Sequence, residues 1–216
     1  MSHGAPAHQF HPATAQARQA PIDAPVMSVH GFDDEGRGEV ESFIRRVYAE
    51  RFGADVQHFA PVLVCLRDAE GIVAAAGYRH AQQGPLFLER YLDAPVESLL
   101  KSNPAAAPSR QGIVEVGHLA SIRAGEGRRL ILLLGPHLAT LGFQWVVSTL
   151  TVELRRLFIR IGVTPLTLGA ADPAKLGGEA SQWGSYYDHR PLVLAGNLPQ
   201  AVRQLALQCP GARGSE

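Results

Sequence analysis

Hydrophobic and polar residues follow two different periods along the middle of the chain, and each change of period marks a predicted element. Residues 113–121 form a β-branched run with alternating polar positions, which is typical of a strand, and the turn 123–128 follows it closely. Residues 130–141 have helical spacing and end at a glycine. A second strand, 143–149, and a second helix, 152–161, come next. Two parallel strands joined by one crossover helix are the simplest arrangement for this order.

The same patterns predict elements on either side of this central unit. The apolar face of residues 37–52, closed by Gly53, is a clear helical pattern. Residues 86–93 fit neither period, so their secondary structure stays open. The other predicted elements are strands at 25–30, 62–67, 72–79, 164–168 and 191–196 and helices at 96–101 and 198–208.

The composition predicts one domain with short tails. A chain of 216 residues that is 46% hydrophobic and 19% charged can bury one substantial core, which we assign to residues 25–208. Residues 1–24 are rich in Ala, Pro, His and Gln, so we expect a disordered N-terminal tail. We expect residues 209–216 to form a frayed C-terminal tail.

Charge and cysteine content exclude several classes of function. A formal net charge of zero gives no general attraction to nucleic acid or to an anionic membrane surface. Cys65 and Cys209 lie far apart and have no neighbours at metal-ligand spacing, so neither a disulfide framework nor a metal site is expected. No signal peptide and no transmembrane stretch is recognisable, and we therefore predict a cytoplasmic location.

The turn after the central strand is the first candidate binding site. Gly125 and Gly127 lack side chains, so the backbone can approach a ligand, and the free amides of a helix start attract anions. Arg123, Arg128 and Arg129 add positive charge. This chemistry favours a phosphate or pyrophosphate, although a tight turn with solvated arginines would have the same sequence.

These motifs resemble those of a known superfamily. A strand, the turn R-A-G-E-G-R, a helix, a strand and then L-F-I-R-I-G resemble the acyl-donor half of the GNAT acyltransferases. Residues 40–196 resemble the thermostable hemolysins through F-G-A-D-V-Q-H-F, L-F-L-E-R-Y-L-D, V-E-V-G-H-L-A-S and W-G-S-Y-Y-D-H. Residues 115–119 are also similar to the E-x-S-R-F motif of autoinducer synthases. The resemblance implies an α/β (α+β) fold: a GNAT-like mixed, mostly antiparallel central sheet with a parallel splayed pair and helices on both faces.

The resemblance also implies a function, the transfer of an acyl group from acyl-CoA or an acyl carrier protein to a small amine. The turn would cradle the pyrophosphate, and the amides of the central strand would meet the thioester carbonyl. The implied donor-binding residues are Leu119, Ala120, Arg123, Gly125, Gly127, Arg128 and Arg129. The candidate acceptor-binding residues are Arg79, Phe87, Tyr91 and Trp183, for which a surface ion pair or ordinary aromatic packing is the alternative.

Glu115 and His118 are the candidate bases. In a regular strand they point to opposite faces unless a bulge at Gly117 changes the register, and each could instead be a structural residue of the core. GNAT enzymes often carry a tyrosine acid where this chain has Phe158, so we consider Tyr186 and Tyr187 as replacements. Protonation of the leaving thiolate by water is the remaining possibility.

Two other functions stay open at this stage. The loss of the tyrosine at Phe158, together with Ile122 where GNAT enzymes usually have Gln or Arg, would suit a non-catalytic protein that binds acyl thioesters or lipids. The family name also suggests a membrane-active hemolysin, although the sequence shows neither spanning helices nor the alternating strands of a barrel. The oligomeric state and the identity of the acceptor are not predicted.

Overall fold

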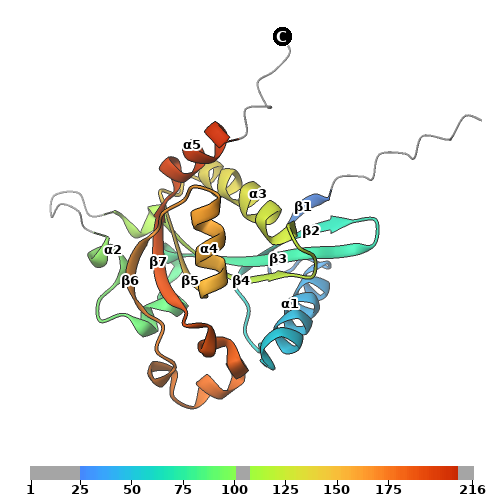
Figure 1. Cartoon of the computed structure of the whole chain (residues 1–216), viewed down its shortest axis with the longest axis horizontal. Helices are drawn as coiled ribbons and strands as arrows, with labels where there is room; N and C mark the ends of the chain where they lie inside the picture. The colour runs from blue at the N-terminus through green and yellow to red at the C-terminus, as the bar shows by residue number, and fades with distance from the viewer. Residues whose placement is uncertain (1–24, 101–107, 209–216) are drawn as a thin grey trace, which may run out of the picture.

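Seven strands form one sheet, and the helices lie on both of its faces (Figure 1). The computed structural model describes residues 25–100 and 108–208, so the predicted tails at 1–24 and 209–216 lie outside the described residues. The strands are β1 (Val26–His30), β2 (Val62–Asp68), β3 (Gly71–His80), β4 (Ile113–Ser121), β5 (Trp145–Leu150), β6 (Leu166–Ala170) and β7 (Leu192–Asn197). The helices are α1 (Arg37–Phe52), α2 (Val96–Leu99), α3 (Glu126–Thr140), α4 (Val152–Arg160) and α5 (Leu198–Gln208).

The sheet has the order β1-β2-β3-β4-β5-β7-β6. Among the described strands, β4 and β5 run parallel, and the other neighbouring pairs are antiparallel. This arrangement confirms the mixed, mostly antiparallel sheet with one parallel pair. The bounds of α1, β4 and α5 agree with those predicted from the sequence, because each has a clear period and a glycine or polar residue at its end.

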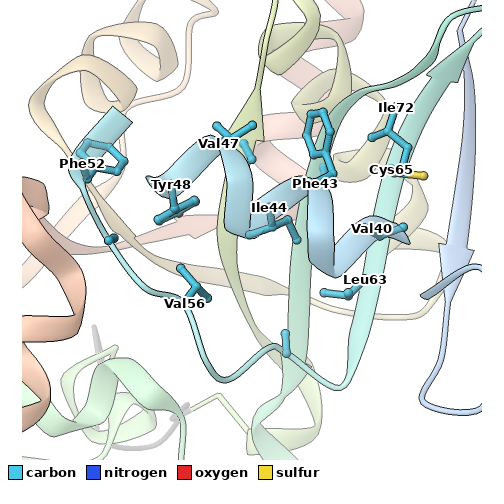
Figure 2. Packing of buried hydrophobic residues seen from close by; sticks show 14 of the residues in the cluster. Val40, Phe43, Ile44, Val47, Tyr48, Phe52, Val56, Leu63, Cys65 and Ile72 are labelled. Carbon is cyan, nitrogen blue, oxygen red and sulfur yellow. The ribbon is translucent and has the colours of Figure 1, made fainter. Parts of the chain in front are cut away.

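The buried strand β2 shows why part of the sequence is almost continuously apolar. Leu63 and Cys65 belong to the cluster under α1 (Figure 2), whereas Val64 and Leu66 belong to the cluster under α3. All four side chains are fully buried. A strand covered by helices on both faces needs apolar residues at every position.

The start of α3 differs from the prediction. The sequence pattern suggested a helix from residue 130, but α3 begins at Glu126, so Gly127 and Arg128 belong to its first turn. Gly125 lies just before the helix with a φ of 93°, a left-handed conformation that favours glycine. The amide of Arg129 donates to the carbonyl oxygen of Gly125 at 2.9 Å and closes the first helical turn. The turn is therefore shorter than expected.

Two 3₁₀ segments cover one edge of the central strands. The run that fitted neither period contains the 3₁₀ helix Phe87–Tyr91. The second segment, Pro173–His189, has non-helical backbone at Gly177 and Gly184. Gly184 lies directly against the carbonyl of Phe52, where a side chain would have no room. This close contact fixes the second segment at the end of α1.

β4 and β5 separate partway along their length. Their register pairs Ile113 with Trp145 and ends at Glu115 with Val147, although β4 continues to Ser121. The second half of β4 therefore has no partner strand on that side. A gap in the middle of a sheet gives room for a ligand and leaves backbone groups available to it.

Candidate functional site

Three hollows surround the separated end of β4. The largest, here called the aromatic pocket, encloses about 1030 Å³ including the part open to solvent. Its walls come from α1, from the loop 55–60, from β3 and β4 and from both 3₁₀ segments. Its lining includes Tyr48, His58, Arg79, Phe87, Tyr91, Glu115, His118, Leu119, Glu179, Trp183, Tyr186 and Tyr187.

The other two hollows lie toward α3 and α4. The apolar cavity, of about 760 Å³, has no acidic or basic side chain in its lining, which includes Val116, Leu119, Ile131, Leu134, Ser148, Phe158, Ile161, Ala201, Val202 and Leu205. The helix-start cleft, of about 480 Å³, lies beside the first turn of α3. Its lining includes Tyr48, Arg51, Leu119, Ala120, Ser121, Gly127, Leu130, Thr151, Leu154 and Tyr186.

Leu119 lines all three hollows, so they meet at one point of β4. Most of the residues singled out from the sequence gather around this point. Those in the aromatic pocket are Arg79, Phe87, Tyr91, Glu115, His118, Leu119, Trp183, Tyr186 and Tyr187. Ala120 and Gly127 line the helix-start cleft. Arg123, Gly125, Arg128 and Arg129 line none of the three.

Glu115 is held in a fixed orientation. Its two carboxylate oxygens accept hydrogen bonds from the amides of Phe87 and Leu88, at 2.8 and 2.9 Å. Burial raises the pKa of Glu115, while these two hydrogen bonds and the charge of Arg79 act in the opposite direction. The carboxylate thus holds the first 3₁₀ helix against β4 and faces the pocket. A carboxylate with a raised pKa is a stronger base than an ordinary carboxylate.

His118 occupies the bulge that the sequence analysis required for it to share a pocket with Glu115. Between the pairs Gly77–Gly117 and Ala75–Ala120, two residues of β4 face one of β3, and His118 has a φ of 54°. The bulge brings both candidate bases to the aromatic pocket.

The ring of His118 is neutral, and only one of its two nitrogens forms a hydrogen bond within the described residues. Its Nε2 lies 3.2 Å from the carbonyl oxygen of His58, so Nε2 carries the hydrogen and donates it. Nδ1 is buried and has no hydrogen-bond partner among the described residues. Burial lowers the pKa of His118 to about 4. Because Nδ1 faces Gly77, where an added Cβ would lie 3.2 Å from it, this nitrogen is less open to a ligand than the carboxylate of Glu115.

Aromatic rings form a continuous wall opposite the two bases. Trp183 connects the 3₁₀ segments, with its ring centre 5.7 Å from Phe87 and 5.6 Å from Tyr186. Tyr187 lies next to Tyr186 at 5.4 Å and to Tyr91 at 6.4 Å. Contacts of this kind stabilise the wall and leave an apolar surface toward the pocket.

The tyrosine hydroxyls differ in whether their hydrogen is free to bond to a ligand. Tyr186 is buried and donates to the carbonyl oxygen of Thr149 at 3.2 Å, so its hydrogen is already used. The hydroxyls of Tyr91 and Tyr187 lie 2.6 Å apart. Their mutual hydrogen bond uses one of two hydroxyl hydrogens, and the other remains available to a ligand. Burial raises the pKa of both Tyr91 and Tyr187, so both are neutral at physiological pH.

The start of α3 presents free amides but fewer free arginines than the sequence suggested. Among the described residues, the amides of Gly127 and Arg128 have no backbone acceptor. Arg123 points instead to the β2–β3 turn, where it pairs with Asp68 at 2.8 Å and Glu70 at 2.9 Å. Arg128 is exposed and Arg129 is half-buried. The positive charge nearest the helix start therefore comes from Arg128 and Arg129, and Glu126, the first residue of α3, adds a negative charge beside them.

The sequence of the chain matches a known protein family. The family model described as thermostable hemolysin matches residues 30–202. This protein belongs to the thermostable hemolysin family. No curated protein sequence matches it.

Solved structures share the fold of this thermostable hemolysin family member. TofI in an apo form has a TM-score of 0.57 at 19% identity, covering 83% of this chain and 95% of that one. MesI, a CoA-dependent acyl-homoserine lactone synthase, has a TM-score of 0.54 at 15% identity, with coverage of 88% and 97%. FeeM, an N-acyl amino acid synthase from uncultured soil microbes, has a TM-score of 0.57 at 14% identity, with coverage of 85% and 97%. At these identities the likeness shows the fold, which is GNAT-like.

The apolar cavity is the part of the candidate site that sequence reasoning missed in this hemolysin-family chain. Its walls come from β4, β5, β7, α3, α4 and α5, which lie far apart in the sequence. One signal was available in the sequence: Leu157 and Phe158 give α4 an apolar side, and in the structure no residue of α4 is buried. An apolar helix face without buried side chains indicates empty space beneath it.

None of the described helices of this hemolysin-family protein is long and apolar enough to cross a membrane. Within residues 25–100 and 108–208, no group of three or more His, Cys, Asp or Glu side chains is arranged to hold a metal ion.

Proposed function

We propose that this protein is an N-acyltransferase, which transfers an acyl group from acyl-CoA, or from an acyl carrier protein, to a small-molecule amine. The observation that carries the proposal is the meeting of three chemically different hollows at Leu119. One is suited to an anion, one to a hydrocarbon chain, and one holds a carboxylate that can accept a proton. Acyl transfer from a thioester needs these three together.

The helix-start cleft would receive the phosphate-bearing arm of the donor. The free amides of Gly127 and Arg128 and the positive end of the α3 dipole attract a pyrophosphate. Gly127 also gives the arm access, because a Cβ at this position would lie 3.1 Å from the hydroxyl oxygen of Ser121. Arg128 and Arg129 would add charge at the rim. The arm would then follow the cleft to Leu119 and Ala120.

The apolar cavity would hold the acyl chain. Its lining is almost entirely hydrocarbon, and Leu119 and Ile131 connect it with the helix-start cleft. A chain buried there stabilises the complex by about 0.8 kcal/mol for each methylene group withdrawn from water. This capacity favours fatty acyl groups over acetyl as the donor.

The chemistry would take place where the hollows meet. Glu115 would accept a proton from the amine as the amine nitrogen attacks the thioester carbonyl carbon. The bulge leaves Leu119 outside the pairing with β3, so its amide can stabilise the oxyanion. Tyr187, through the free hydrogen of the Tyr91–Tyr187 pair, is the better acid for the leaving thiolate, since Tyr186 is bonded to Thr149.

Two glycines at the same position of different helices provide a matched test. Gly127 is the second residue of α3 and Gly38 the second residue of α1, and an added Cβ at Gly38 would meet nothing within 4 Å. Gly127→Val should weaken binding of CoA and of a fatty acyl-CoA at least tenfold in calorimetry. Gly38→Val should leave both affinities unchanged.

The same experiment separates the alternatives. Release of free thiol from acyl-CoA in the presence of an amine panel would support transfer, and the same assay with an acyl carrier protein would identify the better donor. Tight acyl-CoA binding without thiol release on any amine would show a non-catalytic binder instead. Absence of binding to both donors would overturn the proposal, and release of dye from liposomes by pure protein would point to membrane activity.

A further inference from the structure

Arg79 is the one arginine among the described residues that line the aromatic pocket, and the proposed chemistry does not use its charge. It comes from β3 and is half-buried. Within the described residues it forms no ion pair, whereas Arg37, Arg67, Arg90, Arg110 and Arg123 all pair with carboxylates. A cation partly withdrawn from water is unfavourable without a counter-charge, so its presence in a pocket indicates an anionic ligand group.

Glu115 lies directly opposite Arg79 in the antiparallel register of β3 and β4. Cross-strand partners share one face of the sheet, with Cα atoms about 5 Å apart, and both side chains line the aromatic pocket. They nevertheless form no ion pair, because the carboxylate of Glu115 is held by the amides of Phe87 and Leu88. The pocket therefore presents a positive and a negative group side by side, each with capacity for a ligand.

The distribution of charge and apolar surface around this pair restricts the ligand further. Of the other two pocket carboxylates, Glu179 is paired with Arg90 at 2.6 Å, and Asp55 is exposed and accepts a hydrogen bond from the side-chain amide of Gln57 at 3.0 Å. The facing wall consists of aromatic rings from Phe87, Trp183 and Tyr187. A ligand that fits carries an ammonium and a carboxylate close together and an apolar side chain that packs on these rings.

We propose that the acceptor is a free α-amino acid with an aromatic or large apolar side chain, whose carboxylate is bound by Arg79 and whose α-amine lies at Glu115. This inference rests on the proposed transferase function and names the substrate class of the same site. One carbon separates the ammonium and the carboxylate of such an amino acid, so the two groups can bind side by side to the neighbouring side chains of Glu115 and Arg79. The product is an N-acyl amino acid.

The reaction balances without any further reactant. The α-ammonium group gives one proton to Glu115, and the resulting amine attacks the thioester carbonyl carbon, so that a carbon–nitrogen bond forms. The carbon–sulfur bond breaks, and the thiolate takes up a proton to leave as the free thiol. The amide nitrogen loses its second proton as the tetrahedral intermediate collapses, and this proton replaces the one that the thiolate takes up. The carboxylate on Arg79 takes no part in these steps and serves to position the amine.

Binding without turnover is the direct test. Calorimetry of the full chain would compare L-phenylalanine with phenethylamine, which differ only in the carboxylate, in the absence and presence of CoA. We expect L-phenylalanine to bind at least tenfold more tightly than phenethylamine, and L-leucine to bind more tightly than L-aspartate. Arg79→Gln should remove the preference for the carboxylate and leave the affinity for CoA unchanged.

Two further variants distinguish a specific effect of Arg79→Gln from a general loss of folding. Arg156→Gln removes an exposed arginine of α4 outside the pocket and should retain the preference for L-phenylalanine. Arg79→Lys keeps the charge and should retain part of that preference, since an ammonium binds a carboxylate without the bidentate geometry of a guanidinium.

Different results would contradict the amino-acid acceptor and the transferase function. Equal binding of phenethylamine and L-phenylalanine, a preference that survives Arg79→Gln, or no amino-acid binding with or without CoA would each overturn the amino-acid acceptor. Thiol release with simple amines would meanwhile leave the transferase function standing. Conversely, Arg79-dependent binding of L-phenylalanine by a protein that binds neither CoA nor acyl-CoA would support the amino-acid site and overturn the transferase.

Discussion

α1 and α4 both lie against the sheet, but they contact it in opposite ways. α1 buries one complete side, which consists of Arg37 and of the apolar residues Val40, Phe43, Ile44, Val47, Tyr48 and Phe52. Figure 2 shows these apolar residues. None of the residues of α4, from Val152 to Arg160, is buried. The apolar side of α4 faces the apolar cavity, which Phe158 helps to line.

The difference separates the parts of the molecule that hold the fold together from the parts that leave room for ligands. Close packing under α1 supplies dispersion contacts and hydrophobic burial, which stabilise the native state. Under α4, Leu157 and Phe158 pack against a smaller cluster of Ile131, Ile161 and Val163 and stay only partly buried, so a ligand of matching chemistry would supply further contacts. The two helices should therefore respond differently to the same change.

Truncation in each helix should show the largest contrast. Ile44 is 0% exposed in the packed cluster of α1, and Ile44→Ala should lower the free energy of unfolding by about 3 kcal/mol through lost burial and a new cavity. Leu157→Ala, in the half-buried side of α4, should cost less than about 1.5 kcal/mol. Urea denaturation with a constant m-value measures both. Equal losses would mean that α4 is packed as tightly as α1.

The second contrast is in the response to pH, because the aromatic pocket contains titratable groups and the apolar cavity has none. The folded-state pKa of His118, about 4, is below its unfolded value of about 6.5. Between these values the unfolded chain binds more protons, so this group lowers stability as the pH falls from 6.5 toward 4. At pH 5 the loss should be about 1–2 kcal/mol. Above pH 6.5 His118 should have no effect.

His118→Asn isolates this contribution, since asparagine tolerates the positive φ at the bulge. The variant should lose less stability between pH 7 and pH 5 than the wild type. The contribution of Glu115 to stability changes with pH in the opposite direction. Because the pKa of Glu115 is raised, the folded state binds more protons than the unfolded state at pH values above the unfolded-state pKa, so this contribution falls as the pH rises. An unchanged pH profile in His118→Asn would contradict the assignment of a buried neutral imidazole.

Regular periods made most of the fold predictable from the sequence. The helix 37–52 and the strand 113–121 each have a clear hydrophobic pattern, and their bounds agree with those of α1 and β4. The start of α3 was predicted wrongly because Gly127 and Arg128 could belong to a turn or to a first helical turn. Local sequence does not distinguish the two, since the left-handed Gly125 alone sets where the helix begins.

Sequence reasoning singled out several residues that the structure brings together, but it did not predict their partners. Glu115 and Phe87 are separated by 28 positions, and their hydrogen bond depends on how the first 3₁₀ helix meets β4. The bulge at His118 depends on the β3 register, in which Gly77 leaves no space for a side chain beside Ala60. Such contacts between distant segments leave no local pattern in the sequence.

Filling the apolar cavity should change the affinity for long-chain acyl-CoA and not the affinity for free CoA. Ser148 lies on β5 and its buried side chain lines the cavity. Ser148→Phe should weaken the binding of a long-chain acyl-CoA at least tenfold, because the ring takes the space of the chain, while free CoA binds as before. Overpacking would cost about 1–3 kcal/mol of stability if the cavity were closed, and less if it is as open as described.

Ser148→Ala serves as the matched control, since it removes the hydroxyl without filling the space. It should leave both affinities unchanged in calorimetry. If Ser148→Phe reduced the affinity for free CoA and for acyl-CoA equally, the cavity would not be the site of the acyl chain.

The smallest effect should come from Arg123, which the sequence placed at the donor site and the structure pairs with Asp68 and Glu70. Its side chain is 43% exposed, and exposed ion pairs contribute about 0–1 kcal/mol, so Arg123→Ala should change stability by less than about 1 kcal/mol. The affinity for CoA should stay within twofold of the wild type. Arg128→Ala, which removes an exposed charge from the first turn of α3, should lower that affinity more, and the difference should shrink at high salt. A larger loss of CoA binding in Arg123→Ala than in Arg128→Ala would mean that Arg123 leaves its two carboxylates for the phosphates of the donor.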